Sequence, residues 1–570
     1  MPWLWGFAML PALFVTCYQR LFGVGSAYTS RTAAATHDAT ADTAADATTT
    51  DAVAAATSVF NSPRRTTNFK AYALSLALAL PLIVAGLTLS STPAYAIDAK
   101  SEPLDGAQIG VAYMLPNSNK VYGKNSNLYF HPASTQKLLT ALAAMLYLGP
   151  DYEMVTRLEV RADAVGANKR LNVDKTGTLN SDVIVKFTGD PTMRIDHYRT
   201  LLAVLQRHGV HKINGKVILD VSRFGGPSRA NGWSWSDLPS CFTAPSAPII
   251  LNRNCTFAQL VTEGPGSHAS PLIPAGVPID IVSDVTAVSA SDYGGDCILE
   301  ANLFLDNRYH LTGCVPVSPR SQPWPLSLAI ADAERWGVDW TRKILQGLKI
   351  STTQGIEISH SPEADVVTIA QRTSPRLSSM VEYMLQKSNN LYADSIAKNV
   401  AAEYFDLPAT YYRANRAIRS ILKQYAKIDL GSSYIVDASG LSPHNLLTPN
   451  KMLEVLEYIN KNNDKLGIIE LLPVSGKSGT LHWRTSTFNN PLKEHVIAKT
   501  GTLQNVSNLA GFVITQSGVR VPFVMFTNSI TYSERTRDMV KYRRSPSPHY
   551  AYERYVLENI YYERVMGRDF

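Results

Sequence analysis

Ser134 and Lys137 are the pair of residues in this sequence best placed to do chemistry. Pro132 predicts that a helix begins just after it, because proline is tolerated at the start of a helix but not in its interior. Apolar residues then recur at intervals of three and four up to Leu146, and Gly149-Pro150 ends the pattern. Ser134 should therefore lie in the first turn, with Lys137 one turn further along the same face. A partly buried, unprotonated lysine there can be the base that a weakly nucleophilic serine needs.

A serine followed three residues later by a lysine is a weak signal, and the chain contains two more copies. Ser395–Lys398 and Ser420–Lys423 lie within stretches that have the periodicity of amphipathic helices. We interpret both copies as solvent-exposed polar faces. Ser134 differs from them because it lies at a predicted helix start and precedes two further motifs in the chain.

The second motif is Ser388-Asn389-Asn390. A predicted helix over 379–386 precedes it and another begins near Leu391, so the motif is expected in a connecting loop, where functional side chains are common. An ordinary helix cap is the alternative, since serine and asparagine are preferred at caps. With a nucleophile predicted upstream, we favour a functional role for Ser388 and Asn390.

The third motif is the Lys-Thr-Gly-Thr stretch at 499–502, which follows a predicted strand over 495–498. Such a motif at the edge of a sheet offers a fixed cation, a hydroxyl group and a glycine that lets the backbone approach a ligand closely. An earlier Lys-Thr-Gly copy at 175–177 lies among turn-forming residues. We interpret that copy as a turn.

The first 96 residues have the character of a leader rather than of a folded domain. Residues 30–57 are rich in Ala, Thr and Asp and almost free of large apolar side chains, so they cannot form a core. We interpret 1–63 as a disordered or non-native N-terminal extension. Residues 64–96 predict a signal peptide, because basic residues precede an apolar run that ends in Ala94-Tyr95-Ala96. Cleavage is expected after Ala96, and an uncleaved membrane anchor is the alternative.

The charge pattern and the cysteine count narrow the functional classes. A net charge of +7 without a run of lysine and arginine argues against a nucleic-acid partner. Four of the five cysteines follow the leader, an even number in a chain expected to be exported. Their short spacings favour disulfides 241–255 and 297–314, although three connectivities are open from the sequence. A zinc site is the alternative, which the lack of C-x-x-C and H-E-x-x-H disfavours.

Between the motifs, the sequence changes character from one part to the next. Short β-branched runs alternate with Gly, Pro, Asn and Asp over 152–325, with one predicted helix at 198–208. Helical patterning returns at Leu326. We therefore predict a catalytic domain built from 97–151 and 326–570, interrupted by a β-rich insertion.

Together, the three motifs resemble the signature of penicillin-binding proteins and serine β-lactamases. Four stretches narrow the resemblance: GDPT at 189–192, DASGLS at 437–442, LPVSG at 472–476 and KTGTL at 499–503. They are similar to the D-alanyl-D-alanine carboxypeptidase/endopeptidases of peptidase family S13, the low-molecular-mass class C penicillin-binding proteins. The long gap between Ser134 and Ser388 also resembles that family, and the similarity covers 97–570. Ala438, where the family commonly has glycine, and Asn505 depart from its pattern.

This resemblance implies a set of site residues. The catalytic residues would be Ser134, Lys137, Ser388, Asn390 and Lys499, and the substrate-binding residues would be Thr500, Gly501 and Thr502. Ser134 would attack the carbonyl between two D-alanines while Lys137 takes its proton. The backbone N–H groups of Ser134 and Thr502 would form the oxyanion hole.

The same resemblance implies how the leaving group and the substrate are handled. Ser388 would relay a proton toward the leaving amine, together with Lys499. Asn390 would hold the substrate amide, and Lys499 and Thr500 would bind the terminal carboxylate. Water would then release the acyl group from the enzyme.

The implied fold is α/β and multi-domain: a penicillin-binding protein/β-lactamase-like transpeptidase core, with an antiparallel sheet flanked by helices, interrupted by the β-rich insertion. The implied substrates are stem peptides and peptide crosslinks of peptidoglycan in the periplasm, with β-lactam antibiotics as covalent inhibitors. No metal or cofactor and no nucleic acid is expected, and a homo-oligomer is compatible with the resemblance. The alternatives are a serine β-lactamase or esterase on the same fold and a catalytically inactive cell-wall-binding scaffold. The complete set of polar motif residues argues against the scaffold.

Overall fold

A computed structural model of the chain describes residues 104–567, apart from 105, 119, 168–169, 294–296, 318–322 and 543–545. The N-terminal extension predicted over 1–63 and the signal peptide predicted over 64–96 lie outside the described residues. The described residues belong to one compact unit. None of their helices is long and apolar enough to cross a membrane.

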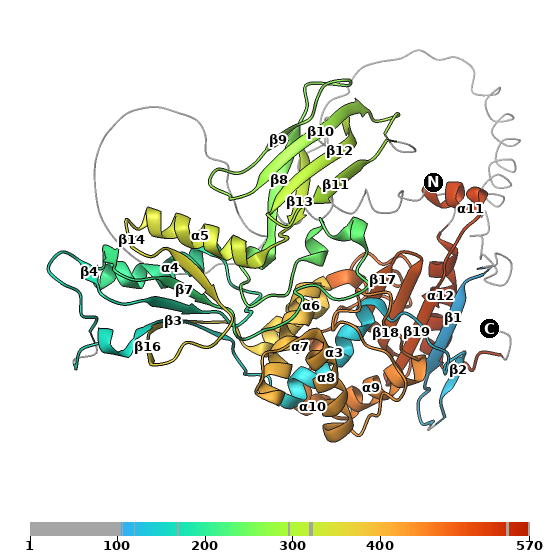
Figure 1. The fold of residues 1–570 in the computed structure, drawn as a ribbon. Helices are drawn as coiled ribbons and strands as arrows, with labels where there is room; N and C mark the ends of the chain where they lie inside the picture. The colour runs from blue at the N-terminus through green and yellow to red at the C-terminus, as the bar shows by residue number, and fades with distance from the viewer. Residues whose placement is uncertain are drawn as a thin grey trace, which may run out of the picture. The chain divides into compact units, whose positions relative to one another are not determined.

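A five-stranded antiparallel sheet forms the centre of the catalytic core (Figure 1). Its strands are β1 (Gln108–Tyr113), β2 (Tyr122–Lys124), β17 (Val496–Leu503), β18 (Val506–Ile514) and β19 (Arg520–Asn528). The order is β17-β18-β19-β1-β2, so the first strand of the core pairs with the last, with Gly110 opposite Phe526. Strands from near both ends of the described chain therefore lie side by side in this sheet, and β17 lies at one of its edges.

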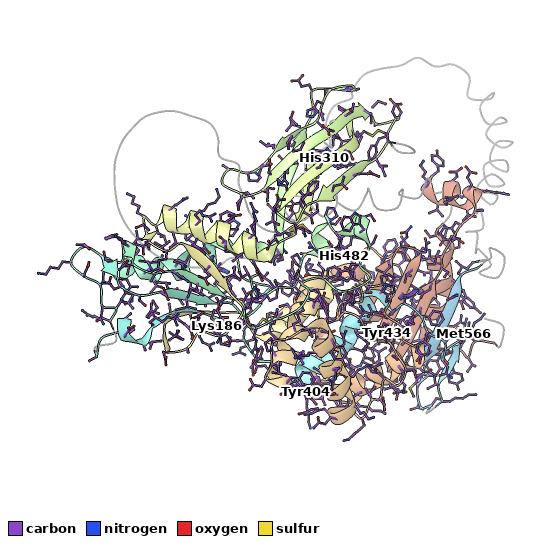
Figure 2. All side chains as sticks on the ribbon, in the orientation of Figure 1. Lys186, His310, Tyr404, Tyr434, His482 and Met566 are labelled. Carbon is purple, nitrogen blue, oxygen red and sulfur yellow. A yellow bond between two sulfur atoms is a disulfide. The ribbon has the colours of Figure 1, made fainter. Side chains whose placement is uncertain are left out.

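Helices cover both faces of this sheet. They are α3 (Lys137–Tyr147), α6 (Leu377–Lys387), α7 (Asn390–Phe405), α8 (Tyr411–Tyr425), α9 (Pro449–Lys461) and α12 (Pro548–Tyr561). Successive side chains of a strand point to opposite faces. Ala112 and Phe512 pack with α3, α6, α7, α8 and α9, whereas Val111 and Phe523 pack with α12 and with Met566, labelled in Figure 2. The predicted antiparallel sheet flanked by helices is confirmed.

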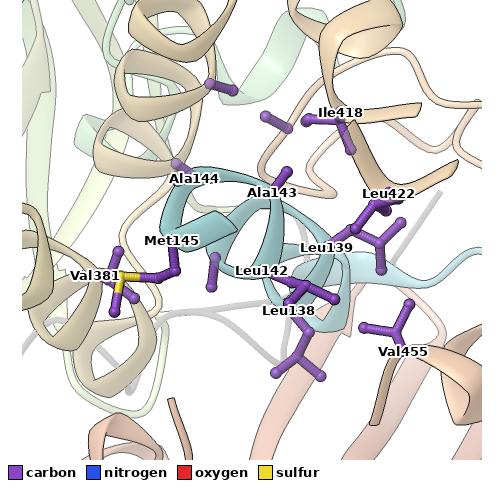
Figure 3. Packing of buried hydrophobic residues seen from close by; sticks show 14 of the residues in the cluster. Leu138, Leu139, Leu142, Ala143, Ala144, Met145, Val381, Ile418, Leu422 and Val455 are labelled. Atoms are coloured by element: carbon purple, nitrogen blue, oxygen red, sulfur yellow. The ribbon is translucent and has the colours of Figure 1, made fainter. Parts of the chain in front are cut away.

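Helix α3 is buried over nearly its whole length (Figure 3). Leu138 and Leu142 are fully buried in the same cluster as Val381 of α6, Leu422 of α8 and Val455 of α9. Each fully buried leucine side chain contributes about 1.5–3 kcal/mol to folding. A helix that is packed on nearly all sides cannot shift easily. Helix α3 therefore holds the residues directly before it in a defined position.

The insertion contains several smaller sheets. The largest has the order β15-β7-β5-β3-β16, and β14-β6-β4, β10-β12-β11 and β13-β8-β9 are three-stranded. The strands are β3 (Val155–Arg161), β4 (Thr178–Leu179), β5 (Val183–Lys186), β6 (Lys212–Ile213), β7 (Val217–Asp220), β8 (Cys255–Val261), β9 (Ser270–Leu272), β10 (Asp280–Ser289), β11 (Leu299–Leu303), β12 (Arg308–Val317), β13 (Trp324–Ala329), β14 (Ser351–Thr352), β15 (Ile356–Ser359) and β16 (Val366–Thr373). Helices α4 (Ile195–Arg207) and α5 (Ala333–Gly347) pack with the largest sheet.

The strand pairing places the end of the insertion later in the chain than the boundary predicted at residue 325. Strand β16 pairs with β3 along most of its length, so the sheet that begins in the insertion ends only at Thr373. Helix α5 contributes Trp336 and Ile344 to the core of that same sheet. An amphipathic helix pattern shows that one face is buried but not which domain buries it. The prediction that helical structure returns at Leu326 was wrong, because Leu326 lies in β13 and the next helix, α5, begins at Ala333 and packs with the sheet of the insertion.

Both predicted disulfides are confirmed. Cys241 pairs with Cys255, with the Cα atoms 5.3 Å apart, and Cys297 pairs with Cys314, with the Cα atoms 5.6 Å apart. The first links a short 3-10 turn at 241–243 to the start of β8. It therefore closes a loop that, as described below, reaches the candidate active site.

Candidate active site

Ser134 lies in a 3-10 turn, η1 (Ala133–Gln136), which runs directly into α3. The sequence predicted one helix from Pro132 onward, and the structure divides it into this tight turn and the α-helix. Ala133 has a positive φ of 48°, an uncommon conformation for a residue with a side chain. The residues on either side of Ser134 are buried, whereas Ser134 itself is half-buried. Its hydroxyl is thus presented on a rigid, closely packed turn.

Lys137 is fully buried, and its Nζ has three oxygen neighbours. They are Ser134 Oγ at 2.8 Å, Asn390 Oδ1 at 2.7 Å and the Ser439 carbonyl oxygen at 2.6 Å. A neutral amine has two N–H groups and one lone pair, and the Asn390 and Ser439 oxygens can only accept. Both N–H groups are therefore occupied when the amine is neutral, and the lone pair is left for the proton of Ser134.

Burial also favours the neutral form of this amine. It lowers the pKa of Lys137, while the negative charges of Asp394 and Asp437 oppose that shift. Desolvation penalises an ammonium group that has no close carboxylate. Geometry and electrostatics thus both suit Lys137 to accept a proton from Ser134.

Ser388 and Asn390 lie at the junction of α6 and α7. Ser388 ends α6 in the left-handed conformation, with φ 55°. Asn389 caps α7, and its side chain accepts a hydrogen bond from the Tyr392 N–H at 3.0 Å. The cap that was the alternative interpretation is therefore present, but it is made by the middle residue of the motif. The outer two, Ser388 and Asn390, contact the buried lysines of the site.

Strand β17 carries the third motif. The sequence predicted that the strand ends at Ala498, whereas it continues to Leu503, so the motif lies within the strand. Lys499 is fully buried and donates from Nζ to Ser388 Oγ at 2.8 Å and to the Thr500 carbonyl at 2.9 Å. Burial lowers the pKa of Lys499, and the nearby cations of Lys137 and Arg484 lower it further.

The remaining residues of this strand differ in exposure. Thr500 is buried and donates from Oγ1 to Thr480 Oγ1 at 2.8 Å, whereas Thr502 is exposed. A Cβ atom on Gly501 would lie 2.7 Å from the Pro132 carbonyl oxygen. Only glycine allows β17 to approach the turn that carries the nucleophile this closely.

The loop at 437–442 is a part of the site whose role sequence reasoning missed. Its motif served only as a mark of resemblance, yet the Ser439 carbonyl accepts from Lys137. Asp437 holds the loop, since its carboxylate accepts from the N–H groups of Gly440 and Ser442, both at 2.7 Å, and from Trp233 Nε1 at 2.9 Å. An aspartate three residues before a glycine is a turn signal that could have been recognised.

Two segments of the insertion reach this site. Asn390 donates from Nδ2 to the Phe242 carbonyl at 2.9 Å, while its Oδ1 accepts from Lys137. Trp233 contacts Asp437 as described above. The insertion thus fixes the orientation of the Asn390 amide and supports the loop that faces Lys137.

The three additional motif copies have two different outcomes. Lys175 and Thr176 of the copy at 175–177 lie in an exposed turn, and Lys423 is an exposed helix residue paired with Asp429 at 2.8 Å, as predicted. The interpretation of Ser395–Lys398 as a solvent-exposed face was wrong, because both residues are fully buried. Ser395 donates to the Gly189 carbonyl of the insertion. Periodicity predicted a polar face but not that the insertion covers it.

Most of the chain matches one protein family. Residues 95–544 match the family described as D-Ala-D-Ala carboxypeptidase 3 (S13). The chain belongs to the S13 family. The match spans every motif residue from Ser134 to Thr502, and the family resemblance inferred from the sequence is confirmed.

Relatives and solved structures agree with S13 membership. D-alanyl-D-alanine carboxypeptidase DacB of Haemophilus influenzae is 35% identical over 426 residues, which cover 74% of this chain and 86% of that protein. The crystal structure of penicillin binding protein 4 (dacB) from Haemophilus influenzae has a TM-score of 0.73 at 33% identity, and the match covers 82% of this chain and 99% of that one. Its complex with a β-lactam has a TM-score of 0.70 at 32% identity. The S13 fold therefore extends through both the core and the insertion.

Proposed function

We propose that this S13 chain is a serine-type D-Ala-D-Ala carboxypeptidase and DD-endopeptidase that cleaves peptidoglycan peptides through an acyl-enzyme. The observation that carries the proposal is the set of contacts around Lys137, which leave its lone pair facing Ser134 Oγ at 2.8 Å. Family membership supports the reaction class. The predicted signal peptide supports a periplasmic location for the reaction.

In the acylation step, the Ser134 oxygen bonds to the carbonyl carbon between two D-alanines as its proton passes to Lys137. Charge develops on the carbonyl oxygen, and backbone N–H groups of Ser134 and Thr502 would stabilise it. Loss of one such donor typically costs about 10²–10³ in rate. The C–N bond then breaks, and the leaving amine takes the proton that Lys137 removed from Ser134, relayed through Ser388, whose hydroxyl is 2.8 Å from Lys499 Nζ.

The free carboxylate of the substrate would be bound at β17. Lys499 supplies a buried cation once a carboxylate partner is present, and Thr500 and Thr502 supply hydroxyl donors on the same strand. Gly501 keeps the strand close to the nucleophile. Asn390 is placed to bind the substrate amide while it also holds Lys137.

Water completes the cycle: its oxygen bonds to the acyl carbon, one of its protons passes through Lys137 to the Ser134 oxygen, and the bond between that oxygen and the acyl carbon breaks. A peptide crosslink presents the same D-configured carbonyl with a larger leaving amine, so endopeptidase activity needs no second site. β-Lactam antibiotics would acylate Ser134 by the same step, because their strained amide carbonyl is attacked in the same way. No metal ion or cofactor takes part in this scheme.

Two measurements on the purified protein test the proposal. Muropeptides incubated with it are analysed by mass spectrometry, and we expect loss of terminal D-alanine and cleavage of crosslinks. A fluorescent penicillin should label the protein covalently but not the Ser134→Ala variant, whereas Ser420→Ala should be labelled normally. Rapid hydrolysis of the penicillin without a lasting label would indicate a β-lactamase. No label and no muropeptide change would indicate an inactive scaffold.

A further inference from the structure

Helix α7 carries a buried polar stripe that extends away from the active site. Asn390, Asp394 and Lys398 follow one another at intervals of four residues, so they lie on one face of the helix. Asn390 contacts Lys137 at 2.7 Å. Asp394 and Lys398 are each only 1% exposed. Fully buried aspartate and lysine residues are rare unless they are paired, so their role has to be explained.

Asp394 supports the peptide segment that holds Lys137. Its Oδ1 accepts a hydrogen bond from the Ala438 N–H at 3.0 Å, and the phenol of Tyr411 donates to its Oδ2 at 3.5 Å. The residue after Ala438 is Ser439, whose carbonyl accepts from Lys137 at 2.6 Å. Asp394 therefore acts on Lys137 through one peptide unit.

Lys398 lies one helical turn beyond Asp394 on the same face of α7. Its Nζ donates to the Ser246 carbonyl of the insertion at 2.6 Å and lies 4.1 Å from the centre of the Tyr411 ring. A carbonyl and an aromatic face stabilise a cation without neutralising it. Burial lowers the pKa of Lys398 to about 7, and the charge of Asp394, one helical turn away, opposes that shift.

The charged groups that face Asp394 come from several elements. They are Lys137 from α3, Lys398 from α7 itself and Asp437 from the loop, together with the polar phenol of Tyr411 from α8. Burial raises the pKa of Asp394, and the charge of Asp437 adds to that effect, while both lysines oppose it. Lys499 is the further cation near Lys137. A carboxylate paired with Lys137 alone would keep that lysine as an ammonium, which cannot accept a proton.

We propose that Asp394 is a positioning residue, shared between Lys137 and Lys398, that fixes the Ser439 carbonyl and controls the charge state of Lys137. It touches no substrate. It keeps the catalytic amine of Lys137 in place. Because Lys398 shares the Asp394 carboxyl group, Lys137 is exposed to less negative charge than a carboxylate paired with it alone would supply. The proposal rests on the proposed function, since acylation of Ser134 is the reaction that reports the charge of Lys137.

The test is the pH dependence of penicillin acylation in Asp394→Asn. The amide keeps an acceptor for the Ala438 N–H but removes the negative charge, which raises the pKa of Lys137 in the native protein. Lys137 then loses its proton at lower pH, and we expect the acidic limb of the acylation rate constant to move to lower pH. Asp394→Ser, smaller and also neutral, provides the same test if the amide variant does not fold.

Ser395→Ala is the matched control, because it removes a buried hydrogen bond of the same helix without changing a charge. We expect its acidic limb to coincide with that of the unmodified protein. An unmoved limb in folded Asp394→Asn, or an equal shift in Ser395→Ala, would overturn the inference. Failure of the unmodified protein to be acylated would instead refute the proposed function, so the two failures can be told apart.

Discussion

Replacing Lys499 by alanine tests whether activity depends on where a Lys-Thr-Gly motif lies in the fold or on the motif alone, because the chain contains a second copy of the motif. Lys499 is fully buried on β17 and contacts Ser388 and the Thr500 carbonyl. Lys175 occupies the equivalent place in the other copy, but it lies in an exposed turn of the insertion. The two variants therefore remove the same side chain from the same local sequence in different surroundings.

The expected loss of activity follows from the contact between Lys499 and the substrate carboxylate, which the alanine variant cannot make. Removing one partner of a buried, charge-assisted contact typically costs about 2–5 kcal/mol. Each 1.4 kcal/mol is a factor of ten, so we expect Lys499→Ala to lower kcat/KM by about two to three orders of magnitude. Lys175→Ala should change kcat/KM by less than about threefold, as is usual for an exposed residue.

The assay is hydrolysis of a D-Ala-D-Ala peptide by both variants, with circular dichroism to establish that each is folded. Lys499→Met is a useful third variant, because it retains most of the side-chain volume and so separates loss of charge from formation of a cavity. We expect it to lose as much activity as Lys499→Ala. Equal losses in the Lys499 and Lys175 variants, or a larger loss at Lys175, would refute the site as described.

Three further predictions follow from the site. Burial lowers the pKa of Lys137 to about 7, so acylation by penicillin, measured by stopped-flow, should rise as the pH passes through that value, and a flat profile would contradict Lys137 as the base. Gly440→Ala should abolish labelling and lower the melting temperature, because φ is 79° there and the new Cβ would lie 1.8 Å from the Ala133 carbonyl oxygen. Replacing Cys241 and Cys255 by serine should lower the free energy of unfolding in urea by about 3 kcal/mol, and unchanged stability would refute a structural role for that disulfide.

The contact between Ser134 and Lys137 could be predicted because it depends on local geometry. Residues three apart are neighbours in any helical turn, and Pro132 and the apolar pattern located that turn. The division into a 3-10 turn and α3 could not be predicted, since it follows from the packing of Ala133 and its neighbours in the core. The roles of these residues in catalysis stay predictions until the variants are measured.

The acceptors that hold Lys137 could be predicted only in part. Asn390 belonged to a visible motif, whereas the other acceptor is the backbone carbonyl of Ser439. A backbone carbonyl is the same in every residue, so no residue type marks its position. The Phe242 carbonyl, which orients the Asn390 amide, could not be predicted from the sequence for the same reason.

Sequence by itself determined the order of the three motifs, the favoured pairing of nearby cysteines and the helical faces, because each depends on residue types at short spacing. Only the tertiary structure decided which faces are covered. Lys398 and Lys423 have the same local motif, yet the first is buried against the Ser246 carbonyl and the second is exposed. The difference arises from contacts between segments about 150 residues apart, as for Lys398 and Ser246. Local periodicity carries no information about such contacts, because burial depends on which distant segment packs there.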